Sequence, residues 1–63
     1  MLRIKETRKT VGITQQELAQ KVGATREYIS NIENNHKKPS LDLLERIALV
    51  LNTSIKDLIE DSA

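Results

Sequence analysis

Aliphatic residues recur along the chain at spacings of three and four residues, which is the period of an α-helix. This pattern predicts five short helices, at about residues 2–10, 14–23, 26–34, 40–51 and 55–60. The chain has no alternating strand pattern and no repeat. Because helices this short are marginal when isolated, they must pack against one another. We therefore expect an all-α fold, with residues 1–63 forming one compact five-helix domain.

Residues with known capping preferences stand at the expected ends of these helices. Thr14, with Glu17 three residues later, forms a capping-box sequence. Gly12, Gly23 and Asn52 suit the left-handed conformation that ends many helices. Three further N-caps are predicted, at Thr25, Ser40 and Ser54.

The helical period also separates buried from exposed apolar positions. Inward positions are predicted at Leu18, Val22, Ile29 and Ile32, and at Leu41, Leu44, Ile47, Ala48 and Leu51. Leu43, Leu49 and Val50 lie off this stripe. The last helix adds Ile55, Leu58 and Ile59, which are more apolar residues than one short helix needs in order to pack against the core. We expect part of this set, Leu49, Ile55 and Ile59, to form a homodimer interface. The alternative is that the last helix merely closes the core.

Composition excludes several classes of function. The chain has no cysteine, which rules out disulfides, thiolate metal sites and cysteine nucleophiles. It has no apolar run of membrane-spanning length and no signal-peptide pattern, so a cytoplasmic protein is expected. The acidic pairs near the carboxyl end have no histidine beside them and indicate a solvated helix surface. We predict no catalytic residues, no metal and no cofactor, and therefore not an enzyme.

The net charge of +1 hides an uneven distribution. Residues 1–38 carry eight basic and four acidic side chains, whereas residues 39–63 carry two basic and five acidic ones. Such a split suits a protein that turns one end toward a polyanion, although chance alone can also produce it.

One set of residues has a characteristic spacing, with Gln15, Leu18, Ala19, Gly23, Thr25, Ile29, Ser30, Ile32 and Glu33 continued by Pro39, Ser40, Leu41, Ile47, Ala48 and Leu51. This set resembles the lambda-repressor-like, Cro-type helix-turn-helix family, also called the XRE family. A glycine suits the tight turn between two steeply crossing helices, and Gly23 supplies it. The resemblance implies a helix-turn-helix at about residues 14–34 and a helical pair at about 40–60. Departures are small: Thr7, Ala24, Asn35 and Asn52 replace residues that are commoner in the family.

The resemblance also implies which residues face DNA. In a helix-turn-helix, the second helix enters the major groove with its N-terminal residues at the base edges. The expected base contacts are Thr25, Arg26, Glu27 and Asn31. Arg26 can pair with guanine and Asn31 with adenine. Glu27 fits only if it accepts from cytosine or pairs with Arg26; otherwise it belongs to a solvated helix face.

Phosphate contacts are expected on both sides of that helix. Free amides at the start of the helix at 14–23 attract anions, which favours Thr14 and Gln15. The remaining expected contacts follow from the resemblance and comprise Ser30, Asn34, His36, Lys37 and Lys38. A solvated loop is the alternative for residues 34–38.

Arg8 and Glu33 have a structural role in the resembled family, where their counterparts form a buried ion pair. Tyr28 is expected to pack against a neighbouring helix and not to stack on a base.

The expected function is a sequence-specific regulator of transcription that binds double-stranded DNA. We expect a repressor, acting as a homodimer on a pseudo-palindromic operator and associated with the nucleoid when bound. The alternative is an antitoxin or another protein-interaction module, whose partner would be a toxin or antagonist. A polar, basic face on the helix at 26–34 favours DNA, whereas an apolar face there favours a protein partner.

Overall fold

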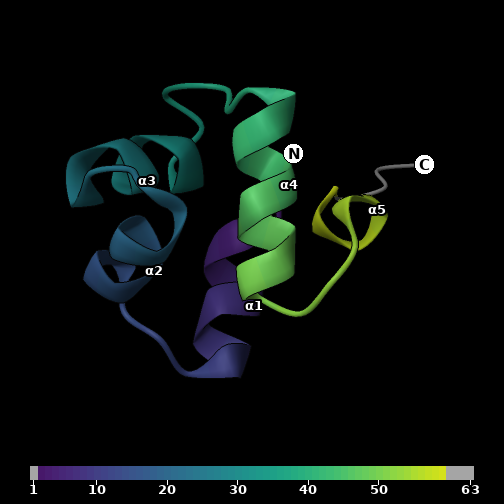
Figure 1. Ribbon diagram of the computed structural model, residues 1–63. Helices are drawn as coiled ribbons and strands as arrows, with labels where there is room; N and C mark the ends of the chain where they lie inside the picture. Colours follow the sequence, from purple (N-terminus) through teal and green to yellow (C-terminus); the bar gives the residue numbers. More distant parts are fainter. Residues whose placement is uncertain (1, 60–63) are drawn as a thin grey trace.

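A computed structural model describes residues 2–59 of the chain, which contain five helices (Figure 1). The helices are α1 (Ile4–Val11), α2 (Gln15–Val22), α3 (Arg26–Glu33), α4 (Leu41–Val50) and α5 (Ile55–Leu58). Helices α2 and α3 lie on one side of α4, and α5 lies on the other. The all-α prediction is therefore confirmed. The last helix ends at Leu58, earlier than expected, because Ile59 is extended; the expected last residue, Glu60, lies outside the described residues.

The structure confirms the capping residues that the sequence predicts. The Thr14 hydroxyl accepts from the Glu17 amide, and the Glu17 carboxylate accepts from the Thr14 amide, which completes the capping box. Side-chain oxygens of Thr25, Ser40 and Ser54 cap α3, α4 and α5 in the same way. Within residues 2–59, left-handed backbone occurs at Gly12, Gly23, Asn35 and Asn52. Local sequence signals thus determine the helix ends that carry a cap.

The core consists of aliphatic side chains contributed by all five helices. The side chains with almost no exposed surface are Ile4, Leu18, Ile29, Ile32, Ile47 and Leu58. Tyr28 packs on the edge of this core, as expected from the sequence. Residues of α2 contact both α3 and α4, so the core holds the helix-turn-helix against the long helix.

Two assignments on α4 are wrong. Leu41 was expected in the core but has 65% of its surface exposed, whereas Leu43 was expected off the stripe and is buried. The buried stripe of α4 is centred on Ile47 and Leu51. At 100° per residue, Leu41 lies roughly 90° from that centre and at the first turn, beyond the reach of the core. Leu43 therefore belongs to the core and is not available for an interface.

The two ends of the described chain meet through a short backbone contact. Leu2 and Ile59 form an isolated antiparallel bridge, and the Arg3 amide donates to the Leu58 carbonyl at 2.7 Å. Leu2 is therefore extended, and the first helix begins two residues later than the apolar pattern suggested. A pairing between residues so far apart in sequence leaves no local signal.

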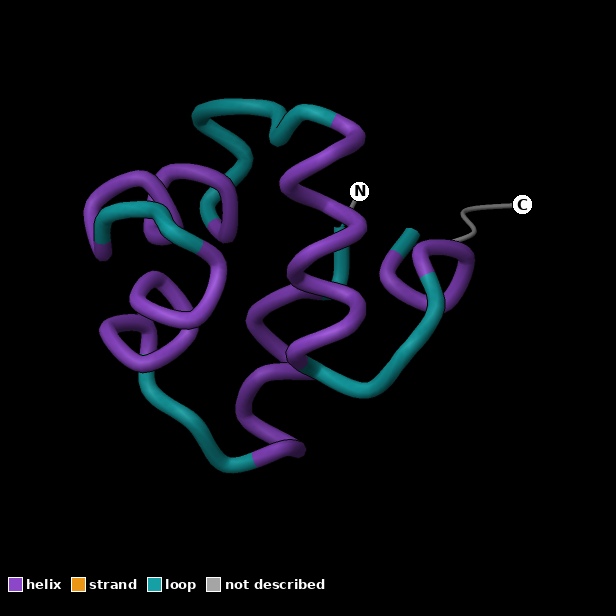
Figure 2. Tube along the Cα trace, viewed as in Figure 1, coloured by secondary structure: helices purple, strands orange, loops and turns teal. Residues whose placement is uncertain are grey.

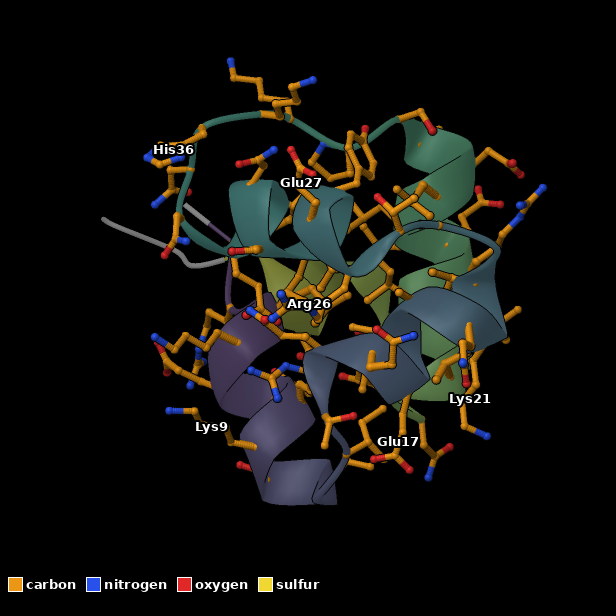
Figure 3. The ribbon with its side chains drawn as sticks, turned by 90° about the vertical axis from the view of Figure 1, so that its left-hand side faces the viewer. Lys9, Glu17, Lys21, Arg26, Glu27 and His36 are labelled. Atoms are coloured by element: carbon orange, nitrogen blue, oxygen red, sulfur yellow. The ribbon has the colours of Figure 1, made fainter. Side chains whose placement is uncertain are left out.

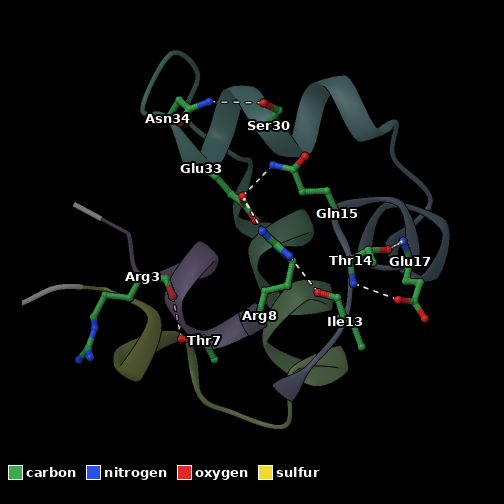
Figure 4. A network of polar contacts seen from close by, with 10 residues as sticks. All are labelled: Arg3, Thr7, Arg8, Ile13, Thr14, Gln15, Glu17, Ser30, Glu33 and Asn34. Carbon is green, nitrogen blue, oxygen red and sulfur yellow. Dashed lines mark hydrogen bonds and ion pairs between the residues drawn. The ribbon is translucent and has the colours of Figure 1, made fainter. Parts of the chain in front are cut away.

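A buried ion pair connects α1 to α3, the second helix of the helix-turn-helix. The Arg8 guanidinium on α1 donates to both carboxylate oxygens of Glu33 on α3, at 2.8 and 3.3 Å (Figure 4). The same guanidinium donates to the Ile13 carbonyl at 2.8 Å, and the Gln15 side chain donates to Glu33 at 2.9 Å. The side chains of Arg8 and Glu33 are only 10% and 1% exposed. This network joins α1, α2 and α3.

Replacement of Arg8 by alanine is expected to lower the free energy of unfolding by about 3–5 kcal/mol, because it leaves the Glu33 carboxylate buried without its cation. Urea denaturation of the two proteins measures this difference. The control is Arg3→Ala, which removes the exposed pair of Arg3 with Glu6 (3.7 Å) and should cost less than about 1 kcal/mol. Equal losses of unfolding free energy in the two variants would show that the buried pair stabilises the fold no more than the exposed pair does.

Candidate nucleic-acid interface

The turn between α2 and α3 fixes the relative orientation of these two helices. Gly23 has a φ of 74°, and the Ala24 amide donates to the Ala19 carbonyl at 2.9 Å, so the chain reverses within a few residues (Figure 2). Arg46 on α4 donates to the Val22 carbonyl at 3.5 Å, at the end of α2. A cation at this helix end also complements the negative end of the helix dipole. Helix α2 is therefore joined to α3 by the turn and to α4 by the Arg46 contact.

The outward face of α3 is polar. Thr25, Arg26, Glu27 and Asn34 are exposed, and Ser30 and Asn31 are partly buried. Arg26 points toward α1 and α2, whereas Glu27 points to the opposite edge of α3 (Figure 3). Among the described residues, these two side chains form no ion pair. The pairing of Glu27 with Arg26 that the sequence left open is absent.

Arg26 borders a shallow hollow of about 510 Å³ where α1, α2 and α3 meet. The hollow is lined by Arg8, Lys9, Gly12, Ile13, Thr14, Gln15, Gln16 and Arg26. It combines two exposed basic side chains, Lys9 and Arg26, with the first turn of α2, whereas Arg8 is already paired with Glu33. Since the first amides of a helix have no partner within the helix, this surface is suited to an anion such as a phosphate.

The Thr14–Glu17 capping box decides which amides of α2 remain available. Its hydrogen bonds use the backbone amides of Thr14 and Glu17, whereas the backbone amides of Gln15 and Gln16 take no part in it. Hydrogen bonds from Thr14 hold the pKa of the Glu17 carboxyl below its ordinary value. The carboxylate therefore stays charged beside the helix end that it caps.

A loop with two lysines follows α3 on the other side of the interface. Asn35 adopts a φ of 62°, and the Asn31 carbonyl accepts from the amides of His36 and Lys37, at 2.8 and 3.3 Å. The Lys37 ammonium lies 5.9 Å from the centre of the Tyr28 ring, within the range of a cation–π contact. His36, Lys37 and Lys38 are all exposed. The side-chain amide of Asn34 donates to the Ser30 hydroxyl at 3.3 Å.

The expected base contacts thus lie on one helix, between two groups of expected phosphate contacts. The structure adds details that sequence reasoning missed. The Gln15 side-chain amide already donates to Glu33, so the backbone amide of Gln15 is the better candidate for a phosphate contact. Lys9 and Gln16 join the hollow because α1 ends beside α2, an arrangement that no local pattern indicates.

Residues 2–59 contain no cluster of three or more histidine or acidic residues that could hold a metal ion. None of the helices in this part of the chain is long and apolar enough to cross a membrane.

These features define a DNA-binding transcriptional regulator of the helix-turn-helix class. The sequence profile of the Helix-turn-helix family matches residues 4–58, and the chain belongs to that family.

Relatives and solved structures agree with this classification. The chain is 50% identical over 56 residues to an uncharacterized HTH-type transcriptional regulator of Archaeoglobus fulgidus, covering 89% of this chain and 80% of the relative. It is 40% identical over 60 residues to the HTH-type transcriptional regulator SinR of Bacillus subtilis, covering 94% of this chain. The match spans 54%, about half, of SinR. A crystal structure of SinR in complex with DNA has a TM-score of 0.84 at 41% identity, covering 92% of this chain and 94% of that chain.

The lowered pKa of Glu17 predicts a pH dependence of stability. A carboxyl whose pKa is lower in the folded state stabilises the fold above its unfolded pKa, and this contribution is lost as the pH falls below 4.5. Glu17→Gln keeps a capping partner for Thr14 but cannot titrate. Thermal unfolding across this pH range should therefore show a weaker pH dependence in Glu17→Gln than in the parent protein. Identical pH dependence in both proteins would contradict this role of the capping box.

Proposed function

We propose that this protein is a sequence-specific repressor that binds double-stranded DNA as a homodimer on a pseudo-palindromic operator. The observation that carries the proposal is the placement of a polar α3 face between two basic surfaces, the hollow beside α2 and the lysine loop. Phosphate contacts on both sides of a recognition helix fix its position in the groove, so that side chains on its exposed face can read bases. A bound dimer would block access of other proteins to the operator.

In this proposal Thr25, Arg26, Glu27 and Asn31 contact base edges. Arg26 has two roles open to it, because it borders the hollow as well as the α3 face. The role at a base is favoured by its place at the first residue of α3, where such helices approach the groove floor. Glu27 has no cationic partner within α3, which favours acceptance of a hydrogen bond from cytosine.

The proposed phosphate contacts fall into two groups. Thr14 and the Gln15 amide belong to the hollow, to which the structure adds the Gln16 amide and Lys9. Ser30, Asn34, His36, Lys37 and Lys38 belong to α3 and the following loop. Because the ammonium of Lys37 is near the Tyr28 ring, Lys38 is the lysine with more freedom to reach a phosphate.

The dimer is proposed to form through the surface that carries Leu49, Ile55 and Ile59. Leu49 is 80% exposed and Ile59 is 49% exposed, whereas Ile55 is partly buried against the core. Leu58 is fully buried, so this residue of the last helix packs into the core and is not available for an interface. A two-fold dimer would double the number of bases read and set the two α3 helices about 34–36 Å apart.

The alternative function, a protein-interaction module acting through α3, is less well supported. The large apolar side chains that are exposed in residues 2–59 are Val11, Leu41, Leu49 and Ile59. None of them lies on α3. The α3 face therefore has the polar character that favours DNA.

The division between base readers and phosphate contacts can be tested with two variants. Arg26→Ala should cost about 1–3 kcal/mol on the preferred site and relax base preference at one position in each half-site. Lys38→Ala should weaken binding to all sequences alike and reduce the slope of log affinity against log salt by about one per subunit. The measurement is a titration of a selected operator and of single-base variants at several salt concentrations. If both variants change affinity and specificity in the same way, the proposed division is wrong.

The proposed dimer can be tested by comparing two substitutions on α4. Leu49→Asp should weaken operator binding by about tenfold or more, because a symmetric interface would then contain two carboxylates. Leu41→Asp is the matched control, since Leu41 is also exposed on α4 but lies outside the proposed interface. Sedimentation should show weaker self-association of Leu49→Asp alone. A single subunit bound to each operator, with no self-association of the parent protein at high concentration, would contradict the dimer.

A further inference from the structure

A second depression lies away from the hollow, where the loop after α3 approaches the two ends of the described chain. It has a volume of about 430 Å³ and is lined by Leu2, Asn35, Lys37, Lys38, Pro39, Leu44 and Ile59. This volume falls within the range of about 300–1,000 Å³ that is typical of ligand-binding pockets. We call it the loop groove.

The chemistry of the loop groove is amphipathic. Four of its lining residues, Leu2, Pro39, Leu44 and Ile59, are apolar and form its floor, and Ile59 also belongs to the proposed dimer surface. The exposed side chains of Lys37 and Lys38 form the rim, and no carboxylate of residues 2–59 belongs to the lining. Neither lysine forms an ion pair with an acidic side chain of residues 2–59. The groove therefore presents apolar surface next to positive charge that has no acidic counterpart in this part of the chain.

We propose that the loop groove is a docking site for an acidic, aliphatic peptide segment of a partner protein, and that the docked segment competes with DNA for Lys38. Aliphatic side chains of the segment would cover the floor, and its carboxylates would pair with the lysines. One wall of the groove contains Leu2 and Ile59, whose backbones are extended and paired with each other. An extended peptide can align with such backbone, which favours a peptide over a compact small molecule.

The competition follows from the position of Lys38 and rests on the proposed function. Lys38 is both a rim residue of the loop groove and a proposed phosphate contact. A carboxylate paired with this ammonium would remove it from a phosphate and place a negative charge near the DNA backbone. A partner could thereby release the regulator from DNA without touching α3.

Docking can be measured without DNA, using fluorescence anisotropy of a short labelled peptide in which leucine and glutamate alternate. Two matched peptides serve as controls, one with lysine in place of glutamate and one with serine in place of leucine. The leucine–glutamate peptide should bind saturably and about tenfold tighter than either control. No saturable binding, or equal binding of all three peptides, would overturn the proposal.

Variants of the protein locate the binding site. Lys38→Glu and Ile59→Ser should each weaken peptide binding about fivefold or more, and both positions are exposed enough to tolerate the change. Val11→Ser is the matched control and should bind the peptide as the parent does, because Val11 on α1 is exposed to nearly the same extent as Ile59 but lines neither the groove nor the proposed dimer surface. Loss of peptide binding in Val11→Ser, or unchanged binding in Lys38→Glu and Ile59→Ser, would overturn the assignment. Either result would favour a second copy of the chain as the occupant of the loop groove.

A competition experiment separates this proposal from the proposed function. The leucine–glutamate peptide should displace the parent protein from a DNA duplex, whereas the serine–glutamate peptide should not. Peptide binding with no effect on bound DNA would overturn the competition. Failure of the parent protein to bind any duplex would contradict the proposed function itself, while the DNA-free peptide titration still decides whether the groove is a docking site.

Discussion

The buried ion pair between Arg8 and Glu33 is the constraint on which the interface depends. Two charges taken out of water are tolerated only when their hydrogen bonds are satisfied, and here Ile13 and Gln15 supply the remaining partners. The side chains of residues 2–59 contain no buried polar atom without a hydrogen bond. Because the partners come from α1, α2 and α3, the network fixes how these three helices meet.

The position of the interface follows from this constraint and from the turn at Gly23. The network sets the start of α2 beside the end of α1, which creates the hollow with its free amides and basic side chains. The turn sets the direction of α3 relative to α2, and the contact of Arg46 with the end of α2 holds α2 against α4. The aliphatic core supplies most of the stabilisation, but it is non-directional. Hydrogen bonds and the left-handed turn supply the geometry that a DNA-reading helix requires.

Local signals in the sequence were sufficient for the capped helix ends, because a cap depends on residues three positions apart, as in Thr14 and Glu17, but not for the start of α1, which has no side-chain cap. The side on which α4 is buried could not be predicted as well, since the stripe centred on Ile47 depends on where other helices pack. The contact of Gln15 with Glu33 and the bridge of Leu2 with Ile59 join distant residues and left no local trace. The Arg8–Glu33 pair, 25 residues apart, was accessible only through the family resemblance. The roles of individual residues toward DNA remain predictions, because base readout depends on the partner as well as on this chain.

The most direct test is to follow the backbone amide signals of the labelled protein by nuclear magnetic resonance while it is titrated with a duplex selected from a random pool. The largest changes are expected at residues 14–16, 25–31 and 36–38, which form the α2 start, the α3 face and the lysine loop. Changes confined to α4 and α5, or spread evenly over the chain, would contradict the conclusion that α3 and its two flanking surfaces bind DNA.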